Sequence, residues 1–365
     1  MVINRSKILL FLIVGILCLG FKTGQKPGDP IALRDEKLNF TPREFYIADV
    51  IDERANKNSV ASIVYKDEAQ SYVTRLADLK NGAANAIKLF VLGNLHQDKK
   101  LRQIVITLKE FKLTENSIHG GKVNGHLAMN ISFGMQKDYG VLQLVNYTGG
   151  VRYTRLDIQT NMAETILSQG ITEALSWFNT WINKYADSDP RLAKSVQVSF
   201  SDYTEKPEGD TIYYSSKRPL SWADFKDKPR ASNFEAEIFA SVGYTEHVSV
   251  EKGIIKLDIA VKVNMPKSGS WVRGGSLDDY ALNHEQRHFD IAKIVGEHFK
   301  QKIAGMELPP DNYDGFINVE YLETLRELTR MQTQYDRETH HGADRAAQAT
   351  WNAKIDKELK GLGFK

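Results

Sequence analysis

The stretch SLDDYALNHEQRHFDIAKIVGEHF, residues 276–299, predicts one long helix that organises the C-terminal half of the chain. Gly274-Gly275 break the preceding strand, Ser276 stands where an N-cap is expected, and Asp279 can complete a capping box. Apolar residues and two histidines then recur at spacings of three and four, as expected of one core-facing stripe: Leu277, Ala281, His284, His288, Ile291, Val295 and Phe299. We therefore expect a helix over about 277–305 with both histidines pointing into the protein.

The pentapeptide His284-Glu285-Gln286-Arg287-His288 has the spacing of a zinc site. Residues four apart share one face of a helix, so both imidazoles can reach the same ion. Glu285 lies about 100° around the helix from His284, where it can accept a proton from bound water without being a ligand. A lone buried histidine is usually a hydrogen-bonded core residue, but two on one stripe both need partners away from water. A shared Zn²⁺ is the simpler way to satisfy both, with Glu285 as general base.

The first 20 residues have the pattern of a secretory signal peptide. Two basic residues precede an apolar run from Ile8 to Leu19, which is shorter than the ~18–20 residues that a membrane-spanning helix needs. Leu17 stands before Cys18, where a lipoprotein signal requires a small residue, so we expect cleavage rather than lipid anchoring at Cys18. We therefore expect a secreted or periplasmic protein with no stable membrane span after cleavage.

Composition excludes several classes of site. The chain has 48 basic and 46 acidic residues, and removal of the two basic residues of the signal leaves 46 − 46 = 0 net charge. No basic run with interleaved aromatic residues is present, which argues against nucleic acid as a partner. Cys18, the only cysteine, would leave with the signal, so a metal site in the mature chain must use histidine and carboxylate ligands.

A chain of this length exceeds one typical core, which predicts two domains. We expect a signal peptide at 1–20, a linker at 21–40, a mixed α/β domain of unknown role at 41–190, and an α+β domain at 191–365. In the first domain we expect a helix at 162–185 and a hairpin that turns at Gly149-Gly150. No catalytic constellation is evident there. The clearest strand of the second domain is Ile255 to Val263.

A catalytic zinc needs a third protein ligand. Ile291 and Ile294 stand where a metzincin would have glycine and histidine, and His298 lies about 15 Å along the helix from His288, too far to reach. The third ligand must therefore come from a distant segment. The segment Tyr335 to Gly342 (YDRETHHG) combines histidines, carboxylates and a phenol, although it also has the composition of an exposed helix end. Its candidates are His341, His340, Asp336 and Glu338.

Three sequence blocks in the same order resemble the DUF922 family, which is a bacterial family of secreted zinc-dependent proteases assigned by motif. They are RPLSWADF (218–225), HEQRHFD (284–290) and YDxxTxHG (335–342), with Gln348 and Trp351 following. The resemblance covers about 195–365. It implies that His341, directly before the glycine, is the third zinc ligand. On an unbroken helix, by contrast, Asp336 would share a face with His340.

These observations predict an α+β, zincin-like metallopeptidase domain in the C-terminal half. His284, His288 and His341 would hold zinc, Glu285 would act as general base, and Tyr335 would donate to the developing oxyanion. The strand from Ile255 to Val263 could pair with an extended protein or peptide substrate. A zinc amidase acting on cell-wall material would use the same residues. A cell-envelope binding protein with a structural or degenerate zinc site is the non-enzymatic alternative, and the sequence does not indicate the oligomeric state.

Overall fold

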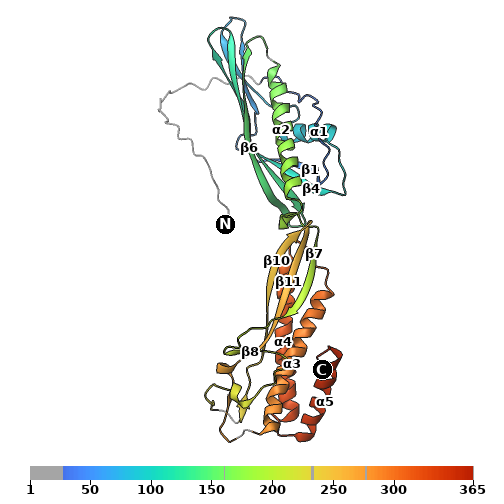
Figure 1. The fold of residues 1–365 in the computed structure, drawn as a ribbon. Helices are drawn as coiled ribbons and strands as arrows, with labels where there is room; N and C mark the ends of the chain where they lie inside the picture. The colour runs from blue at the N-terminus through green and yellow to red at the C-terminus, as the bar shows by residue number, and fades with distance from the viewer. Residues whose placement is uncertain (1–27, 160, 232–233, 276–277, 365) are drawn as a thin grey trace. The chain divides into compact units, whose positions relative to one another are not determined.

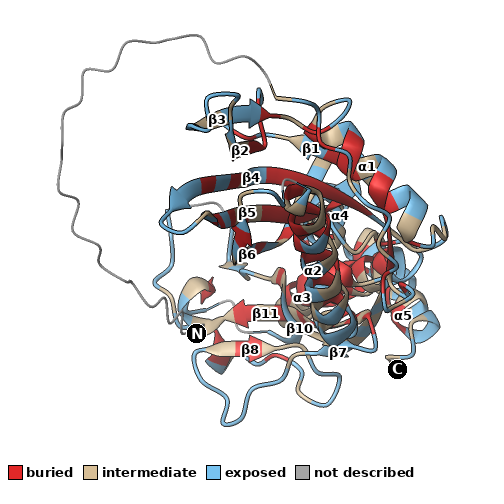
Figure 2. Cartoon of the chain, turned by 90° about the horizontal axis from the view of Figure 1, so that it is seen from above, coloured by how far each residue is buried: buried red, intermediate tan, exposed pale blue. Residues whose placement is uncertain are grey.

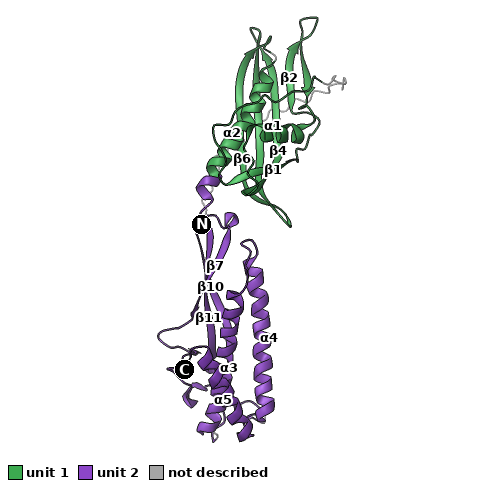
Figure 3. Cartoon of the chain, turned by 90° about the vertical axis from the view of Figure 1, so that its right-hand side faces the viewer, with its two compact units in different colours: residues 1–181 green, residues 182–365 purple. Residues whose placement is uncertain are grey.

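A computed structural model describes residues 28–159, 161–231, 234–275 and 278–364. The chain is α+β and divides into two compact units, Met1–Trp181 and Ile182–Lys365 (Figures 1 and 3). The predicted boundary at 190 lies shortly beyond this division. The predicted signal peptide falls outside the described residues. Within the described residues, no helix has both the length and the apolar composition to cross a membrane.

The first unit is built on a six-stranded sheet of order β3-β2-β4-β5-β6, with β1 pairing in parallel with β4. The helix α2 packs on this sheet through Phe178, whose ring stacks on Phe133 with centroids 4.2 Å apart. The bounds of α2 match the predicted helix. The elements are β1 (Phe45–Asp52), β2 (Ala61–Lys66), β3 (Tyr72–Ala77), α1 (Ala83–Asn94), β4 (Arg102–Ile118), β5 (Lys122–Lys137), β6 (Gly140–Leu156) and α2 (Met162–Tyr185).

The hairpin predicted around Gly149-Gly150 is wrong, because both glycines lie inside the continuous strand β6. They allow close contacts rather than a turn. A Cβ on Gly150 would lie 2.4 Å from the carbonyl oxygen of Leu127 on β5, and one on Gly149 would lie 2.3 Å from the hydroxyl of Tyr147. Glycine in a strand can thus indicate close backbone approach as well as a chain reversal.

Residues 28–40, the described part of the predicted linker, pack on the first unit. Ile31 forms a β-bridge with Leu79, and its side chain is buried. The backbone amide of Arg34 donates to the hydroxyl of Ser168 on α2 at 2.9 Å. This stretch is therefore part of the fold of the first unit.

The second unit packs α3 on a four-stranded sheet of order β10-β11-β7, with β8 pairing with the end of β11, and α4 and α5 pack on α3 (Figure 1). The predicted strand Ile255 to Val263 lies within β11. Because β11 is paired on both sides, it has no free edge for a substrate, and that expectation is wrong. The elements are η1 (Pro190–Leu192), β7 (Ser195–Asp202), β8 (Thr211–Tyr213), η2 (Trp222–Asp224), β9 (Ala236–Glu237), β10 (Ser241–Glu251), β11 (Ile254–Pro266), η3 (Lys267–Gly269), β12 (Trp271–Val272), α3 (Asp279–Ala304), α4 (Tyr313–Thr339) and α5 (Arg345–Gly361).

The helix α3 is the centre of the second unit. Its N-cap is Asp278, whose carboxylate accepts from the amide of Ala281. Ser276, for which the capping box was predicted, and Leu277 lie outside the described residues. Instead of one buried stripe, α3 is buried on nearly all sides between His284 and Gly296. Figure 2 colours the chain by burial. Sheet, α4 and α5 all contact it. The two motif histidines therefore lie in the buried part of α3.

Candidate metal centre

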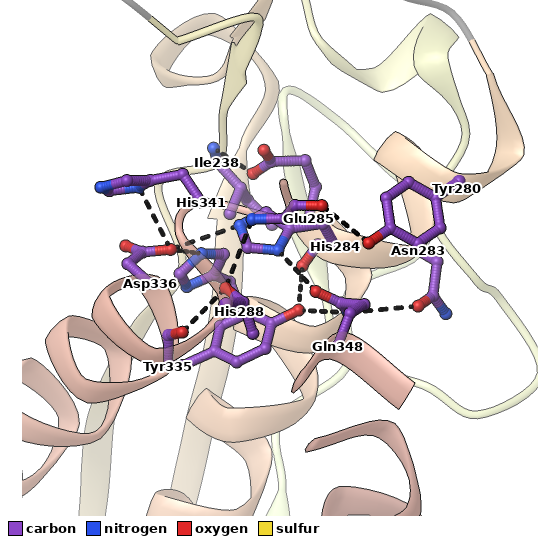
Figure 4. Close-up of polar contacts among 12 residues, drawn as sticks. Ile238, Tyr280, Asn283, His284, Glu285, His288, Tyr335, Asp336, His341 and Gln348 are labelled. Carbon is purple, nitrogen blue, oxygen red and sulfur yellow. Dashed lines mark hydrogen bonds and ion pairs between the residues drawn. The ribbon is translucent and has the colours of Figure 1, made fainter. Parts of the chain in front are cut away.

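Side chains from two helices converge on one point in the second unit (Figure 4). His284 and His288 project from consecutive turns of α3, and Asp336 projects from the last turn of α4. Each of the three residues offers one ligand atom, and these atoms all lie within 4.8 Å of one another. Among the described residues, this is the only group of three or more His, Cys, Asp or Glu side chains with such spacing.

The spacing of the three side chains fits a tetrahedral ion. The Nε2 atoms of His284 and His288 lie 3.3 Å and 2.9 Å from the same Oδ1 atom of Asp336. Two ligands bound to zinc at about 2.0–2.1 Å in tetrahedral geometry would lie about 3.3 Å apart. Two imidazoles and one carboxylate are also a donor set that zinc accepts. The residues present therefore fit the ion that the pentapeptide predicts.

Gln348 on α5 fixes the tautomer of His284. Its Oε1 lies 3.0 Å from Nδ1 of His284, and an amide oxygen can only accept a hydrogen bond. Nδ1 therefore carries a proton, and Nε2 faces Asp336. The amide group of Gln348 is held in turn, because its Nε2 donates to the hydroxyl of Tyr335 at 2.6 Å and to Oδ1 of Asn352 at 3.0 Å. Such supporting hydrogen bonds orient metal-binding histidines and tune their basicity.

Charges are strongly coupled at this point. Burial would raise the pKa of Asp336, but the hydrogen bonds from His284 and His288 outweigh it and hold this pKa well below its usual range. Burial would lower the pKa of His284, but the carboxylates of Asp336 and Glu285 raise it above its ordinary value. The carboxylate of Asp336 is therefore favoured in its anionic form by the two imidazoles that contact it.

Glu285 lies beside the group without being part of it. Its side chain is buried, and its Oε2 accepts a hydrogen bond at 2.9 Å from the backbone amide of Ile238, just after β9. Burial raises the pKa of Glu285, and the neighbouring histidines offset only part of this rise. A carboxylate with a raised pKa is a stronger base at neutral pH, which suits it to accept a proton.

The other predicted ligands are placed differently. The helix α4 ends at Thr339, and His340, His341 and Gly342 follow in left-handed conformation with φ of 52°, 52° and 78°. This turn brings Nδ1 of His341 to 3.5 Å from Oδ1 of Asp336 and packs its ring against that of Phe234, with centroids 4.2 Å apart and the ring planes tilted by 35°. His341 is thus near the group but outside the set within 4.8 Å.

Two of the alternatives lie away from this point. His340 is exposed and lines the mouth of the cleft. Glu338 is turned toward α5, where its Oε2 accepts from Nε1 of Trp351 at 2.9 Å. Of the four candidates in the segment, only Asp336 contacts both motif histidines.

Tyr335 lies beneath the histidines rather than in the cleft. It is fully buried, its ring stacks on His284 with centroids 4.8 Å apart, and its hydroxyl accepts from Gln348. The phenol that does line the cleft is Tyr280, one turn before His284 on the same face of α3. Its hydroxyl donates to the carbonyl oxygen of Gly342 at 2.7 Å. The spacing of four residues between Tyr280 and His284 could have indicated from the sequence that both lie on the same face of the helix.

The remaining residues of the pentapeptide anchor α3. Oε1 of Gln286 accepts from the backbone amide of Leu220 at 2.8 Å, which ties the RPLSWADF block to the helix. Arg287 donates to Asp290 on its own helix at 2.9 Å and to Asp356 on α5 at 2.7 Å. The block itself is held by Arg218, which donates to both carboxylate oxygens of Asp224 at 2.6 Å and 2.7 Å.

A cleft of about 650 Å³ gives access to the convergent group. Its two walls are β9 with its flanking residues and the turn that joins α4 to α5, and its floor carries Glu285 and the three side chains of the group. The volume lies within the ~300–1,000 Å³ range of sites that hold small molecules or peptide segments. The geometry can therefore place an ion, a carboxylate base and a substrate together.

The solved structures that resemble this chain are distant from it in sequence. No curated protein matches the chain. A Xanthomonas campestris protein of family DUF330 is 13% identical, with a TM-score of 0.28, over 44% of this chain and 96% of that one. A minor lipoprotein from Acinetobacter baumannii is 11% identical, with a TM-score of 0.19, over 26% of this chain and 80% of that one.

One family model matches, described as a bacterial protein of unknown function, DUF922. The matched segment, residues 255–342, runs from β11 to the turn after α4 and contains both motif histidines, Glu285 and Asp336. The RPLSWADF block lies outside it. Residues 255–342 of this chain therefore match the model of the DUF922 family, which is the family that their motifs predict.

Proposed function

We propose that the C-terminal unit is a zinc-dependent hydrolase that cleaves peptide bonds outside the cytoplasm, on a zincin-like fold. The observation that carries this proposal is the convergence of His284, His288 and Asp336 beside the buried Glu285. The proposed third ligand is Asp336 in place of His341, because its Oδ1 lies 3.3 Å and 2.9 Å from the two Nε2 atoms. The expected signal peptide supports the location.

When bound, zinc supplies an acidified water and a Lewis acid for the substrate carbonyl. The side chains of the chain then have separate tasks. Glu285 accepts the proton of the attacking water on its carboxylate and passes it to the leaving amine. The amide of Ile238 keeps this carboxylate in place through the hydrogen bond to Oε2. Tyr280 lines the cleft and can turn its hydroxyl from Gly342 toward the oxyanion of the tetrahedral intermediate.

The second candidate, a binding protein with a structural zinc, is disfavoured by Glu285. A structural site needs no buried carboxylate with a raised pKa beside its ligands. Burying such a group costs stability, so its presence favours a catalytic role. Hydrolysis of a non-peptide amide in cell-wall material uses the same side chains. Substrate assays separate that reading from peptide hydrolysis.

The test is metal analysis together with a hydrolysis assay on the purified mature chain. We expect one zinc per chain and cleavage of fluorescein-labelled casein, an unstructured protein. A chelator should abolish the cleavage, and added zinc should restore it. A chain without bound zinc, or cleavage that persists in excess chelator after zinc is removed, would contradict the proposal.

A further inference from the structure

The short strand β9 borders the cleft with one edge paired and the other open. Its antiparallel register with β12 places Ala236 opposite Val272, and the amide of Arg273 donates to the carbonyl oxygen of Glu235 at 2.8 Å. Hydrogen-bonded and non-hydrogen-bonded pairs alternate along such a ladder. Glu235 and Glu237 therefore bond to β12, whereas Ala236 directs its own N–H and C=O to the opposite edge.

Two neighbouring contacts agree with this alternation. The amide of Ile238, two residues beyond Ala236, donates to Oε2 of Glu285 at 2.9 Å, on the edge away from β12. The amide of the next residue, Phe239, donates to the hydroxyl of Ser270, directly before β12, at 2.9 Å. The edge that carries the N–H and C=O of Ala236 is therefore the edge that faces Glu285.

This open edge forms one wall of the cleft. Within the described ranges, β9 pairs with no strand other than β12. An unpaired strand edge binds an extended polypeptide by main-chain hydrogen bonds, at a strand spacing of about 4.8 Å. Ala236 and Ile238 are about 7 Å apart along the strand. A substrate segment that is hydrogen-bonded to Ala236 therefore lies beside Glu285 within two residues of that point.

We propose that Ala236 docks the main chain of an extended protein segment, its N–H donating to a substrate carbonyl and its C=O accepting from a substrate amide. This inference rests on the proposed function, because it places the segment beside the same Glu285. It also names the substrate class, because docking at Ala236 favours unfolded protein over isolated amides. A cell-wall amide without an adjoining extended main chain cannot make the pair of hydrogen bonds to Ala236.

The test compares two substitutions at one position. Ala236→Pro removes the N–H that faces the open edge, and proline is tolerated where that hydrogen does not join the ladder. Ala236→Val keeps the N–H and adds a β-branched side chain suited to a strand. Each is placed in a zinc-loaded Glu285→Gln background, and binding of fluorescein-labelled casein is measured by anisotropy. Zinc content and circular dichroism confirm that both variants fold.

We expect Ala236→Pro to bind casein about tenfold more weakly than Ala236→Val, as loss of one main-chain hydrogen bond implies. Equal binding by the two variants, or no binding of casein by the Glu285→Gln chain, would overturn the docking inference. Binding that depends on Ala236, together with wild-type chain that binds zinc but does not cleave casein, would uphold the docking and refute the hydrolysis. The two failures are therefore distinguishable.

Discussion

Replacing Asp336 by asparagine separates the two candidate third ligands. The substitution keeps the size of the side chain and removes the charge whose Oδ1 lies 3.3 Å and 2.9 Å from the two Nε2 atoms. Loss of a residue that only supports a ligand typically lowers metal affinity 10–100-fold. Loss of a ligand should exceed that range, so we expect zinc affinity to fall by more than about 100-fold.

The metal-free chain gives a second measure of the same substitution. Hydrogen bonds to a charged group contribute about 1.5–3 kcal/mol, against about 0.5–1.5 kcal/mol for neutral pairs. Asp336→Asn turns two hydrogen bonds to a charged group into neutral ones, each weaker by about 1–1.5 kcal/mol, so the free energy of unfolding should fall by about 2–3 kcal/mol. Urea unfolding of the metal-free chain measures this loss.

The assay for affinity is competition with a chromophoric zinc chelator at neutral pH, and the matched control is His341→Ala. Because His341 is nearly half exposed and lies 3.5 Å from Asp336, we expect this control to lose less than about tenfold in affinity. If His341→Ala loses zinc while Asp336→Asn retains it, the assignment of Asp336 is wrong and that of His341, implied by the family resemblance, is right.

Three further outcomes follow from the same contacts. Gln348→Leu should lower zinc affinity about 10–100-fold without removing a ligand, because Nδ1 of His284 loses its acceptor; an unchanged affinity in the chelator competition would contradict this. Tyr280→Phe should lower kcat about 100-fold and leave zinc content unchanged, whereas an unchanged kcat would exclude the hydroxyl from catalysis. Burial would raise the pKa of Asp224, but Arg218 and Ser221 hold it below the ordinary 3.8, so the stabilisation is present above that value and lost as pH falls through the lower folded pKa. Urea unfolding between about pH 5 and pH 2 should therefore show a smaller loss of stability in Arg218→Met than in wild type. Identical pH profiles of the two chains would refute the stabilisation of the Asp224 carboxylate by Arg218.

The sequence predicted the elements whose signals are local. The spacing of His284 and His288 on an apolar helix is a local pattern, and the bounds of α2 and the strand within β11 were local as well. Burial of α3 on nearly all sides was not predicted, because which neighbours cover a helix depends on tertiary packing. The same limit applies to β11, whose pattern indicated a strand but not that both of its edges are paired.

The third side chain of the convergent group could not be chosen from local spacing. The choice depends on where α4 ends, and the left-handed turn at His340 and His341 takes those two residues off the face of the helix that carries Asp336. Gln348 reaches His284 from another helix, so no sequence spacing connects them. Tyr335 and Tyr280 show that nearness in sequence to the candidate ligands does not place a side chain in the cleft. Tyr335 is nearest in sequence to the candidate ligands, but Tyr280 shares the face of α3 that lines the cleft.

The central claim is that Glu285 is the general base of a zinc hydrolase, and Glu285→Gln tests it most directly. The substitution keeps the size of the side chain and an oxygen for the amide of Ile238, but removes the group that accepts the proton. Zinc content and casein hydrolysis are measured on the same preparation. We predict one zinc per chain, as in wild type, with turnover lost. Hydrolysis at the wild-type rate by the zinc-loaded variant would contradict the mechanism.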